Sequence, residues 1–311
     1  MNSQINITLK KRPSMIFSLW QGIKNNGKKM GSENQMPDIT LCWPDAFIDK
    51  KRLHDFCRIC DIAKNTEIPV LYPFVFAYPC MLRMVSLPDF PFSMFKMLHV
   101  RSETIGYRPI QINDRFEVSC NTSDRRTVEK GIEFDLKTSL LVDHETIWEN
   151  TSTFFFRKKT DENSPAFKPP RLINMEQAET IGQWYLPAKD RFRFARISGD
   201  SNGIHYSKPY AKMLGFQRDY AQPLRVAAKC VELLPVSFSR ETVRLNLYYK
   251  GPVYYNSELT LNHQEIKGAH RFDLFCEGNH KPCIRGKIDK LNTSKSDMPA
   301  MASSKDSRGV H

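Results

Sequence analysis

The chain has 311 residues, of which 41% are hydrophobic and 26% are charged, a composition that is ordinary for a globular protein. No apolar run approaches the roughly 20 residues that span a bilayer, so the sequence predicts no membrane span. The net charge of +12 is compatible with nucleic acid. However, no zinc-finger, helix-turn-helix or aromatic RNA-binding pattern accompanies it, so we expect no nucleic-acid partner.

Residues 1–37 are polar and basic, and we predict a partly disordered N-terminal segment there. The apolar piece at 15–20 is too short, and followed by too many lysines, for a secretory signal. We interpret it as a short amphipathic helix lying on the protein, with a membrane surface as the alternative.

Residues 38–160 are predicted to form a first half. A helix is expected at 51–65, and the stretch at 68–87 is apolar on all sides, which is typical of a buried central helix. Strands are then predicted at 97–107, 115–121, 130–143 and 146–156.

A polar, proline-rich linker is predicted at 161–175, and a second half at 176–290. In that half the sequence predicts helices at 209–214 and 216–234 and strands at 240–249, 258–265, 270–277 and 282–287. The strands of the two halves are weakly similar, for example 113–118 with 256–261. Residues 291–311 are predicted to be a disordered tail.

The eight cysteines are scattered and sit among core-like neighbours. Cys57 and Cys60 form a lone Cys-x-x-Cys pair, whereas a zinc site would need a second pair and a thioredoxin-type motif a βαβ context. We therefore predict reduced buried thiols, no metal site and a cytoplasmic protein.

The polar motif at 194–211 reads FARISGDSNGIHYSKPYA. Asp200, Asn202 and His205 fall within six positions, and Gly199 and Gly203 allow a tight turn between them. A carboxylate and an imidazole at this spacing suit the holding of one water and its addition to a double bond. The alternative interpretation is a local helix cap, with His205 as an ordinary surface residue.

This motif resembles the signature of the MaoC-like hydratases, the (R)-specific enoyl-CoA hydratases and 3-hydroxyacyl-thioester dehydratases. Its matching positions are Phe194, Ile197, Ser198, Gly199, Asp200, Asn202, Ile204, His205 and Ala211. Gly203 stands where the family most often has proline. The resemblance implies an α+β double hot-dog fold, in which two central helices are each wrapped by an antiparallel sheet and the sheets join side by side. The first half lacks the motif, which implies one active site and room for a longer acyl chain.

The resemblance further implies reversible hydration of trans-2-enoyl thioesters to (R)-3-hydroxyacyl thioesters, a hydro-lyase reaction of fatty-acid metabolism without cofactor or metal. Asp200 and His205 would hold the water, and Asn202 would orient the group. The expected substrate-binding residues are Ser198, Gly199, Gln222, Leu224, Arg225, Lys208, Lys250 and Tyr72.

The start of the second central helix departs from the family, which often has Ala-His-Gly there with the glycine N–H serving the oxyanion. Pro223 has no N–H, so the Leu224 amide or the Gln222 side chain would take over. Arg225, Lys250 and Lys208 are expected to meet the charged end of the substrate.

The implied partner is an acyl-CoA or acyl-carrier-protein thioester, with the chain acting as a monomeric pseudo-dimer or a homodimer. One alternative is a catalytically inactive hot-dog protein that binds acyl-CoA or acyl carrier protein. The other is an acyl-CoA thioesterase, which usually places a carboxylate on the central helix, where 220–231 offers no Asp or Glu.

Overall fold

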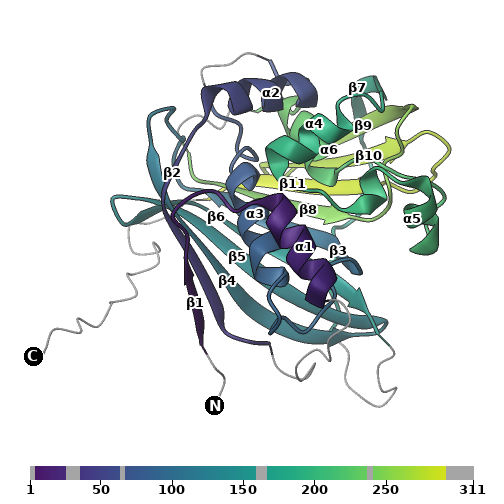
Figure 1. Cartoon of the computed structure of the whole chain (residues 1–311). Helices are drawn as coiled ribbons and strands as arrows, with labels where there is room; N and C mark the ends of the chain where they lie inside the picture. The colour runs from purple at the N-terminus through teal and green to yellow at the C-terminus, as the bar shows by residue number, and fades with distance from the viewer. Residues whose placement is uncertain (1–3, 26–35, 64–66, 159–166, 237–240, 292–311) are drawn as a thin grey trace, which may run out of the picture.

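The computed structural model describes residues 4–25, 36–63, 67–158, 167–236 and 241–291. Across these residues one eleven-stranded sheet runs through the molecule, in the order β1-β2-β4-β5-β6-β3-β8-β11-β10-β9-β7 (Figure 1). The first half contributes β1 Ile5–Thr8, β2 Ile39–Phe47, β3 Met97–Gly106, β4 Arg115–Val128, β5 Gly131–Val142 and β6 Glu145–Arg157. The second half contributes β7 Glu179–Leu186, β8 Val243–Tyr249, β9 Ser257–Ile266, β10 Ala269–Cys276 and β11 Ile284–Lys290.

The two halves of the sheet repeat one strand order. From the outside inward, the first half runs β2-β4-β5-β6-β3 and the second half runs β7-β9-β10-β11-β8, so both use their strands in the same internal sequence. The halves join where β3 and β8 pair antiparallel, from Arg101 opposite Tyr248 to Gly106 opposite Val243. This arrangement confirms the predicted α+β double hot-dog fold. Strand β1 is an addition to it and pairs parallel with β2.

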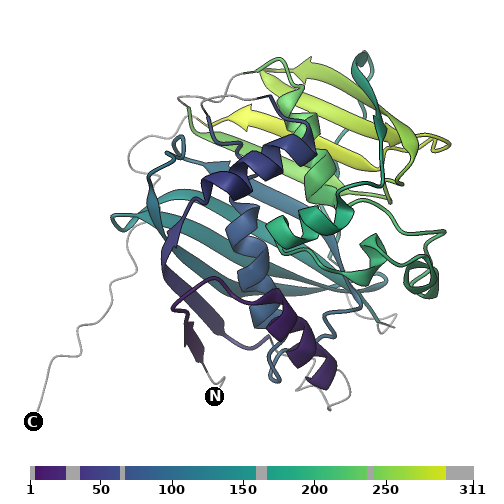
Figure 2. The same ribbon diagram turned by 45° about the horizontal axis from the view of Figure 1, so that its top comes forward.

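Each half wraps one central helix, α3 (Phe74–Val85) or α6 (Pro223–Glu232), and both helices lie on the same face of the sheet (Figure 2). Helix α3 is buried on nearly all sides, as its apolar sequence predicts. Strand β4 shows how the sheet covers it: alternate residues Phe116, Val118 and Cys120 point inward and are buried.

Helix α6 is shorter than the predicted 216–234. It begins at Pro223, whose fixed φ and missing N–H suit the first helical position, and Gln222 before it is extended. Tyr220 instead forms a bridge with Tyr254, which ties this segment to the loop before β9.

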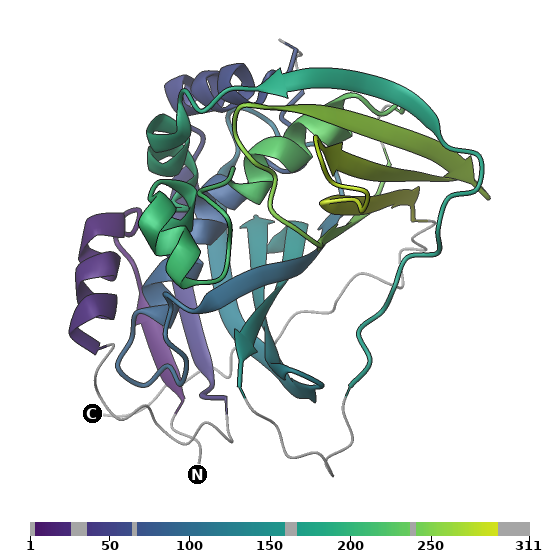
Figure 3. The ribbon, with the colours of Figure 1, turned by 90° about the vertical axis from the view of Figure 1, so that its right-hand side faces the viewer.

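The remaining helices lie over the central ones on the side away from the sheet (Figure 3). They are α1 Met15–Asn25, α2 Lys50–Cys60, α4 Arg191–Ser198, the short 3-10 helix η1 Gly203–His205, and α5 Lys208–Met213. The predicted helix at 51–65 ends early, because Asp61 takes a left-handed conformation that terminates α2.

The segments at the ends of the two halves are partly described. The segment predicted as partly disordered, residues 1–37, contains β1 and α1, and residues 26–35 within it lie outside the described residues. The described part of the linker is held on the sheet, since Arg271 and Arg285 donate to the Ile173 carbonyl oxygen. The predicted tail lies almost wholly outside the described residues. No helix in the described part of the chain is both long and apolar enough to cross a bilayer.

Because β3 and β8 supply each other's pairing partner, we expect residues 1–160 and 161–311 to be insoluble when expressed separately. Co-expression should restore soluble protein, which size-exclusion chromatography would show as a one-to-one complex. A second half that is soluble and monomeric by itself would contradict this dependence.

Candidate active site

The polar motif begins at the end of α4, where the chain reverses. Gly199 takes a φ of +91°, and its N–H donates to the Ala195 carbonyl. A Cβ at this position would lie 2.9 Å from Cγ of Pro79, so glycine is required by conformation and by space. The Ser198 hydroxyl donates to the Phe194 carbonyl (2.9 Å) and accepts from the Asp200 N–H (3.2 Å). These hydrogen bonds fix the position of the Asp200 backbone.

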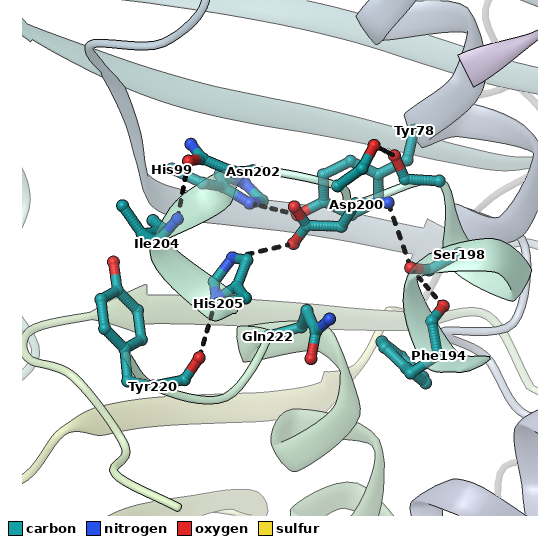
Figure 4. Close-up of polar contacts among 12 residues, drawn as sticks. Tyr78, His99, Phe194, Ser198, Asp200, Asn202, Ile204, His205, Tyr220 and Gln222 are labelled. Carbon is teal, nitrogen blue, oxygen red and sulfur yellow. Dashed lines mark hydrogen bonds and ion pairs between the residues drawn. The ribbon is translucent and has the colours of Figure 1, made fainter. Parts of the chain in front are cut away.

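The imidazole of His205 faces the carboxylate of Asp200, with His205 Nε2 3.4 Å from Asp200 Oδ2 (Figure 4). On its other side, His205 Nδ1 lies 2.9 Å from the Tyr220 carbonyl oxygen. A carbonyl oxygen only accepts, so Nδ1 carries a hydrogen and donates to it. Nε2 is therefore the nitrogen that meets Asp200. Both side chains are largely buried, with exposed fractions of 3% and 12%.

The pKa of Asp200 lies below its ordinary value although the carboxylate is buried. Burial raises this pKa. Nearby His205, a hydrogen bond from the Asn202 backbone and the more distant His99 lower it, and their combined effect is larger than that of burial. Asp200 is therefore an ionised acceptor that faces the imidazole.

Asn202 acts locally through its side chain. Its Oδ1 accepts from the Ile204 N–H at 3.2 Å and caps η1, as the local-cap interpretation predicts. Next to it, Gly203 has a physical reason to replace the usual proline. A Cβ there would lie 3.0 Å from the ring of Tyr210, whose hydroxyl donates to the Phe95 carbonyl.

An apolar cavity of about 90 Å³ opens beside Asp200. Its polar edge consists of Gly199, Asp200, Ser201 and Asn202 from the second half. The apolar wall comes from the first half and is made of Leu19, Tyr78, Met81, Leu82, Val85, Met94, Phe95, Met97 and Phe154. Four residues of this wall, Tyr78, Met81, Leu82 and Val85, belong to the all-apolar stretch predicted at 68–87.

Tyr78 and His99 also lie at this site, and the sequence analysis missed both. The Tyr78 hydroxyl is 2.9 Å from His99 Nδ1, and both side chains lie beside Asp200 (Figure 4). His99 stacks on Phe154, and its Nε2 is buried without a hydrogen-bond partner among the described residues. Burial lowers the pKa of His99 to about 4, although Asp200 acts in the opposite direction. The only signal for His99 in the sequence was a histidine between apolar residues at the start of a predicted strand.

The residues at the start of α6 hold neighbouring side chains in place and provide one backbone donor. The Gln222 amide nitrogen donates to the Tyr206 hydroxyl (2.8 Å) and to the Arg191 carbonyl (3.1 Å), and its oxygen accepts from Tyr255. Both amide hydrogens are therefore engaged within the protein. Leu224 provides the first N–H of α6, because Pro223 has none.

Of the eight predicted substrate-binding residues, Gly199 lines the cavity beside Asp200, whereas the other seven do not. Tyr72 is buried and packs edge-on against Phe56. Arg225 donates to the Lys189 carbonyl and lines a separate cavity between α2, β7 and α6.

The two predicted lysines also lie apart from the cavity. Lys250 Nζ lies over the ring of Tyr248. Tyr249, which lies between these two residues in the chain, contacts His99 instead. Since successive strand residues point to opposite faces, Lys250 is on the face of the sheet away from the site. Lys208 is exposed at the start of α5, three residues after His205.

Comparison with known proteins points to one class. No protein-family model matches the chain. It is 26% identical over 220 residues to 3-hydroxyacyl-thioester dehydratase X of Mycobacterium tuberculosis, covering 71% of this chain and 78% of that protein. The crystal structure of that dehydratase, HtdX, superposes with a TM-score of 0.70 at 22% identity, over 81% of this chain and 100% of its own.

A MaoC-like dehydratase from Phytophthora capsici superposes with a TM-score of 0.68 at 15% identity, over 83% of this chain and 96% of its own. These structural likenesses establish the fold. The chain is therefore similar in sequence to a 3-hydroxyacyl-thioester dehydratase and shares its fold with solved MaoC-like dehydratases.

The neutral state of His99 predicts a pH dependence of stability. Its folded-state pKa of about 4 is below the ordinary 6.5, so the unfolded chain binds more protons between these values. The stabilisation is complete above pH 6.5 and is lost as the pH falls towards 4. Urea titrations across this range should show a steeper loss for the wild type than for His99→Phe, by on the order of 2 kcal/mol. Equal pH profiles would contradict the assignment.

Proposed function

We propose that the chain catalyses the reversible hydration of trans-2-enoyl thioesters to (R)-3-hydroxyacyl thioesters, with Asp200 and His205 as the catalytic pair. The observation that carries this proposal is the 3.4 Å contact between His205 Nε2 and Asp200 Oδ2, in which Asp200 lies at the polar edge of an apolar cavity. The pair can hold one water, and the cavity suits an acyl chain. The sequence similarity to a 3-hydroxyacyl-thioester dehydratase supports the same reaction class.

With Nδ1 bonded to the Tyr220 carbonyl, His205 Nε2 faces Asp200 Oδ2, and we assign Asp200 as the base and a doubly protonated His205 as the acid in hydration. Water oxygen bonds to C3 while Asp200 Oδ2 accepts one water proton. The π electrons of the double bond move towards C2 and the thioester carbonyl, and the Nε2–H of His205 protonates C2. The proton then returns from Asp200 to His205 across their contact, which restores both groups.

Negative charge that develops on the thioester oxygen needs hydrogen-bond donors, and two groups can supply them. The Leu224 N–H stands at the positive end of α6, where helix geometry leaves amides free. The Tyr78 hydroxyl lines the cavity, and it can donate when His99 Nδ1 carries the hydrogen of their shared bond. Asn202 keeps the turn in place rather than reacting. Ser198 and Gly199 have the same supporting role.

The substrate is proposed to be a coenzyme A or acyl-carrier-protein thioester of fatty-acid metabolism, with the exposed Lys208 as the candidate contact for its charged end. We further propose a cytoplasmic protein, in agreement with eight free cysteines, all of which are among the described residues. The pairing of β3 with β8 supports a pseudo-dimer within one chain.

The geometry disfavours the thioesterase alternative. Helix α3 contains no acidic residue, and Glu232, the last residue of α6, accepts from the Ala63 N–H and lines a different cavity. A purely binding hot-dog protein would not need a carboxylate buried against an imidazole, because burying such a pair carries a desolvation cost.

Replacement of the pair should abolish hydration and spare the fold. We expect Asp200→Asn and His205→Ala to lower kcat/KM on the order of 100-fold or more, followed by loss of enoyl-thioester absorbance, and Asn202→Ala to have a smaller effect. His270→Ala on β10, a matched histidine far from the site, should stay within about twofold. A folded Asp200→Asn variant with near wild-type rate would rule out the assignment.

The resemblance to the (R)-specific hydratases predicts a product of (R) configuration, and the apolar wall supplied by the first half, which has no catalytic motif, predicts a preference for medium or long acyl chains. Filling the cavity with Leu82→Trp should lower kcat/KM for a dodecenoyl thioester by about tenfold and leave a crotonyl thioester within about twofold. Chiral chromatography and rates at several chain lengths test both points. An (S) product would contradict the reaction assignment, and equal losses at both lengths would contradict the position of the acyl chain.

A further inference from the structure

Helix α1 presents its large apolar side chains to solvent. Ile16, Phe17, Trp20 and Ile23 are 80, 47, 56 and 65% exposed. The residues that it turns towards the protein include Ser18 and Gly22, which are buried. An amphipathic helix on a globular protein normally has the opposite arrangement, with its large apolar residues inside. The outward residues are spaced at i, i+4 and i+7, so they form one continuous strip along the helix.

This orientation of α1 is fixed by polar bonds and close packing. Arg83 donates to the Gln21 side-chain oxygen at 2.7 Å, and Asn25 donates to the Ser86 carbonyl at 2.9 Å. A Cβ at Gly22 would overlap the sulfur of Met94, so glycine lets α1 approach this side chain closely. The helix cannot turn its apolar strip inward without breaking these contacts.

The apolar strip lies in a cationic setting. Residues 4–25 contain no Asp or Glu, and Lys10, Lys11 and Lys24 are exposed. The Lys24 ammonium lies 5.3 Å from the Trp20 ring centroid, and the Arg83 guanidinium lies 5.5 Å from that of Phe17. Large apolar side chains flanked by cations are the pattern of helices that lie in the headgroup region of a bilayer.

We propose that α1 docks this chain onto the surface of an anionic lipid bilayer. Ile16, Phe17, Trp20 and Ile23 enter the region between headgroups and acyl chains, and the lysines contact lipid phosphates. A carrier protein with an acidic surface would satisfy the cations but would leave four large apolar side chains in water. The lipid surface satisfies both features.

The docking face adjoins the candidate active site. Leu19, on the same helix, lines the cavity beside Asp200, together with Met94, which packs on Gly22. A bilayer under α1 therefore lies next to the wall along which the acyl chain is proposed to bind. Docking itself does not depend on the proposed function, because it needs no turnover.

The test is co-sedimentation of the full chain with vesicles of phosphatidylcholine alone or mixed with phosphatidylglycerol. We expect binding to the anionic vesicles, a blue shift of tryptophan emission from Trp20, and weakening by salt. The triple variant Ile16→Ser/Trp20→Ser/Ile23→Ser should bind at least about tenfold more weakly. A control variant, Phe47→Ser/Ile173→Ser, removes apolar side chains of similar exposure elsewhere and should stay within about twofold.

Hydration of a soluble crotonyl thioester by the triple variant should equal that of the wild type, which separates this proposal from the catalytic one. Three outcomes would overturn the docking proposal. They are no binding to anionic vesicles, equal binding of the triple variant, or a dimer in size-exclusion chromatography that the triple variant loses, which would assign the strip to a second copy of the chain.

Discussion

The hydrogen bond from His205 Nδ1 to the Tyr220 carbonyl is the interaction on which the site depends. It decides which nitrogen of the imidazole meets Asp200, and it holds the ring in a buried position. The carbonyl is itself fixed, because Tyr220 bridges Tyr254 and the next residue, Ala221, donates to the Val253 carbonyl. The loop before β9 therefore fixes the segment that precedes α6, and the Tyr220 carbonyl in this segment fixes the orientation of the imidazole.

The site also requires both halves of the chain, although only one carries the motif. The second half supplies Asp200 and His205, while α3 of the first half supplies Tyr78, Met81 and Leu82 to the cavity wall. The β3–β8 pairing holds the two parts in one rigid sheet. A first half without its own catalytic pair has no second site to preserve, so its apolar helix is free to shape the acyl-chain pocket.

The fold and the centre of the site could be predicted from the sequence because both depend on residues that are close together in the chain. Alternating strands, the all-apolar helical stretch at 68–87 and the run from Phe194 to Ala211 each occupy a short window. The missed elements are β1, β2, β7 and α4, whose patterns are short or interrupted, as by Pro44 within β2. The hydrogen bond that the Asn202 side chain accepts from the Ile204 N–H also agrees with the local-cap interpretation of the turn.

Contacts between distant segments could not be predicted in this way. Tyr78 and His99 meet Asp200 only after the two halves pack together, and nothing near them in the sequence marks that contact. The positions of Tyr72, Arg225 and Lys250 away from the cavity could not be predicted for the same reason. Arg225, for example, is one residue from Leu224, but helical rotation turns it towards α2 and β7.

The central claim is that Asp200 and His205, two groups in contact on one side of the cavity, direct the hydroxyl to C3 and the proton to C2 from the same face of the double bond. Hydration of an enoyl thioester in D₂O, followed by NMR measurement of the coupling between the C2 and C3 protons of the product, tests it most directly. The account predicts a single diastereomer in which deuterium at C2 and hydroxyl at C3 have added to the same face. Anti addition, or a mixture of diastereomers, would contradict it.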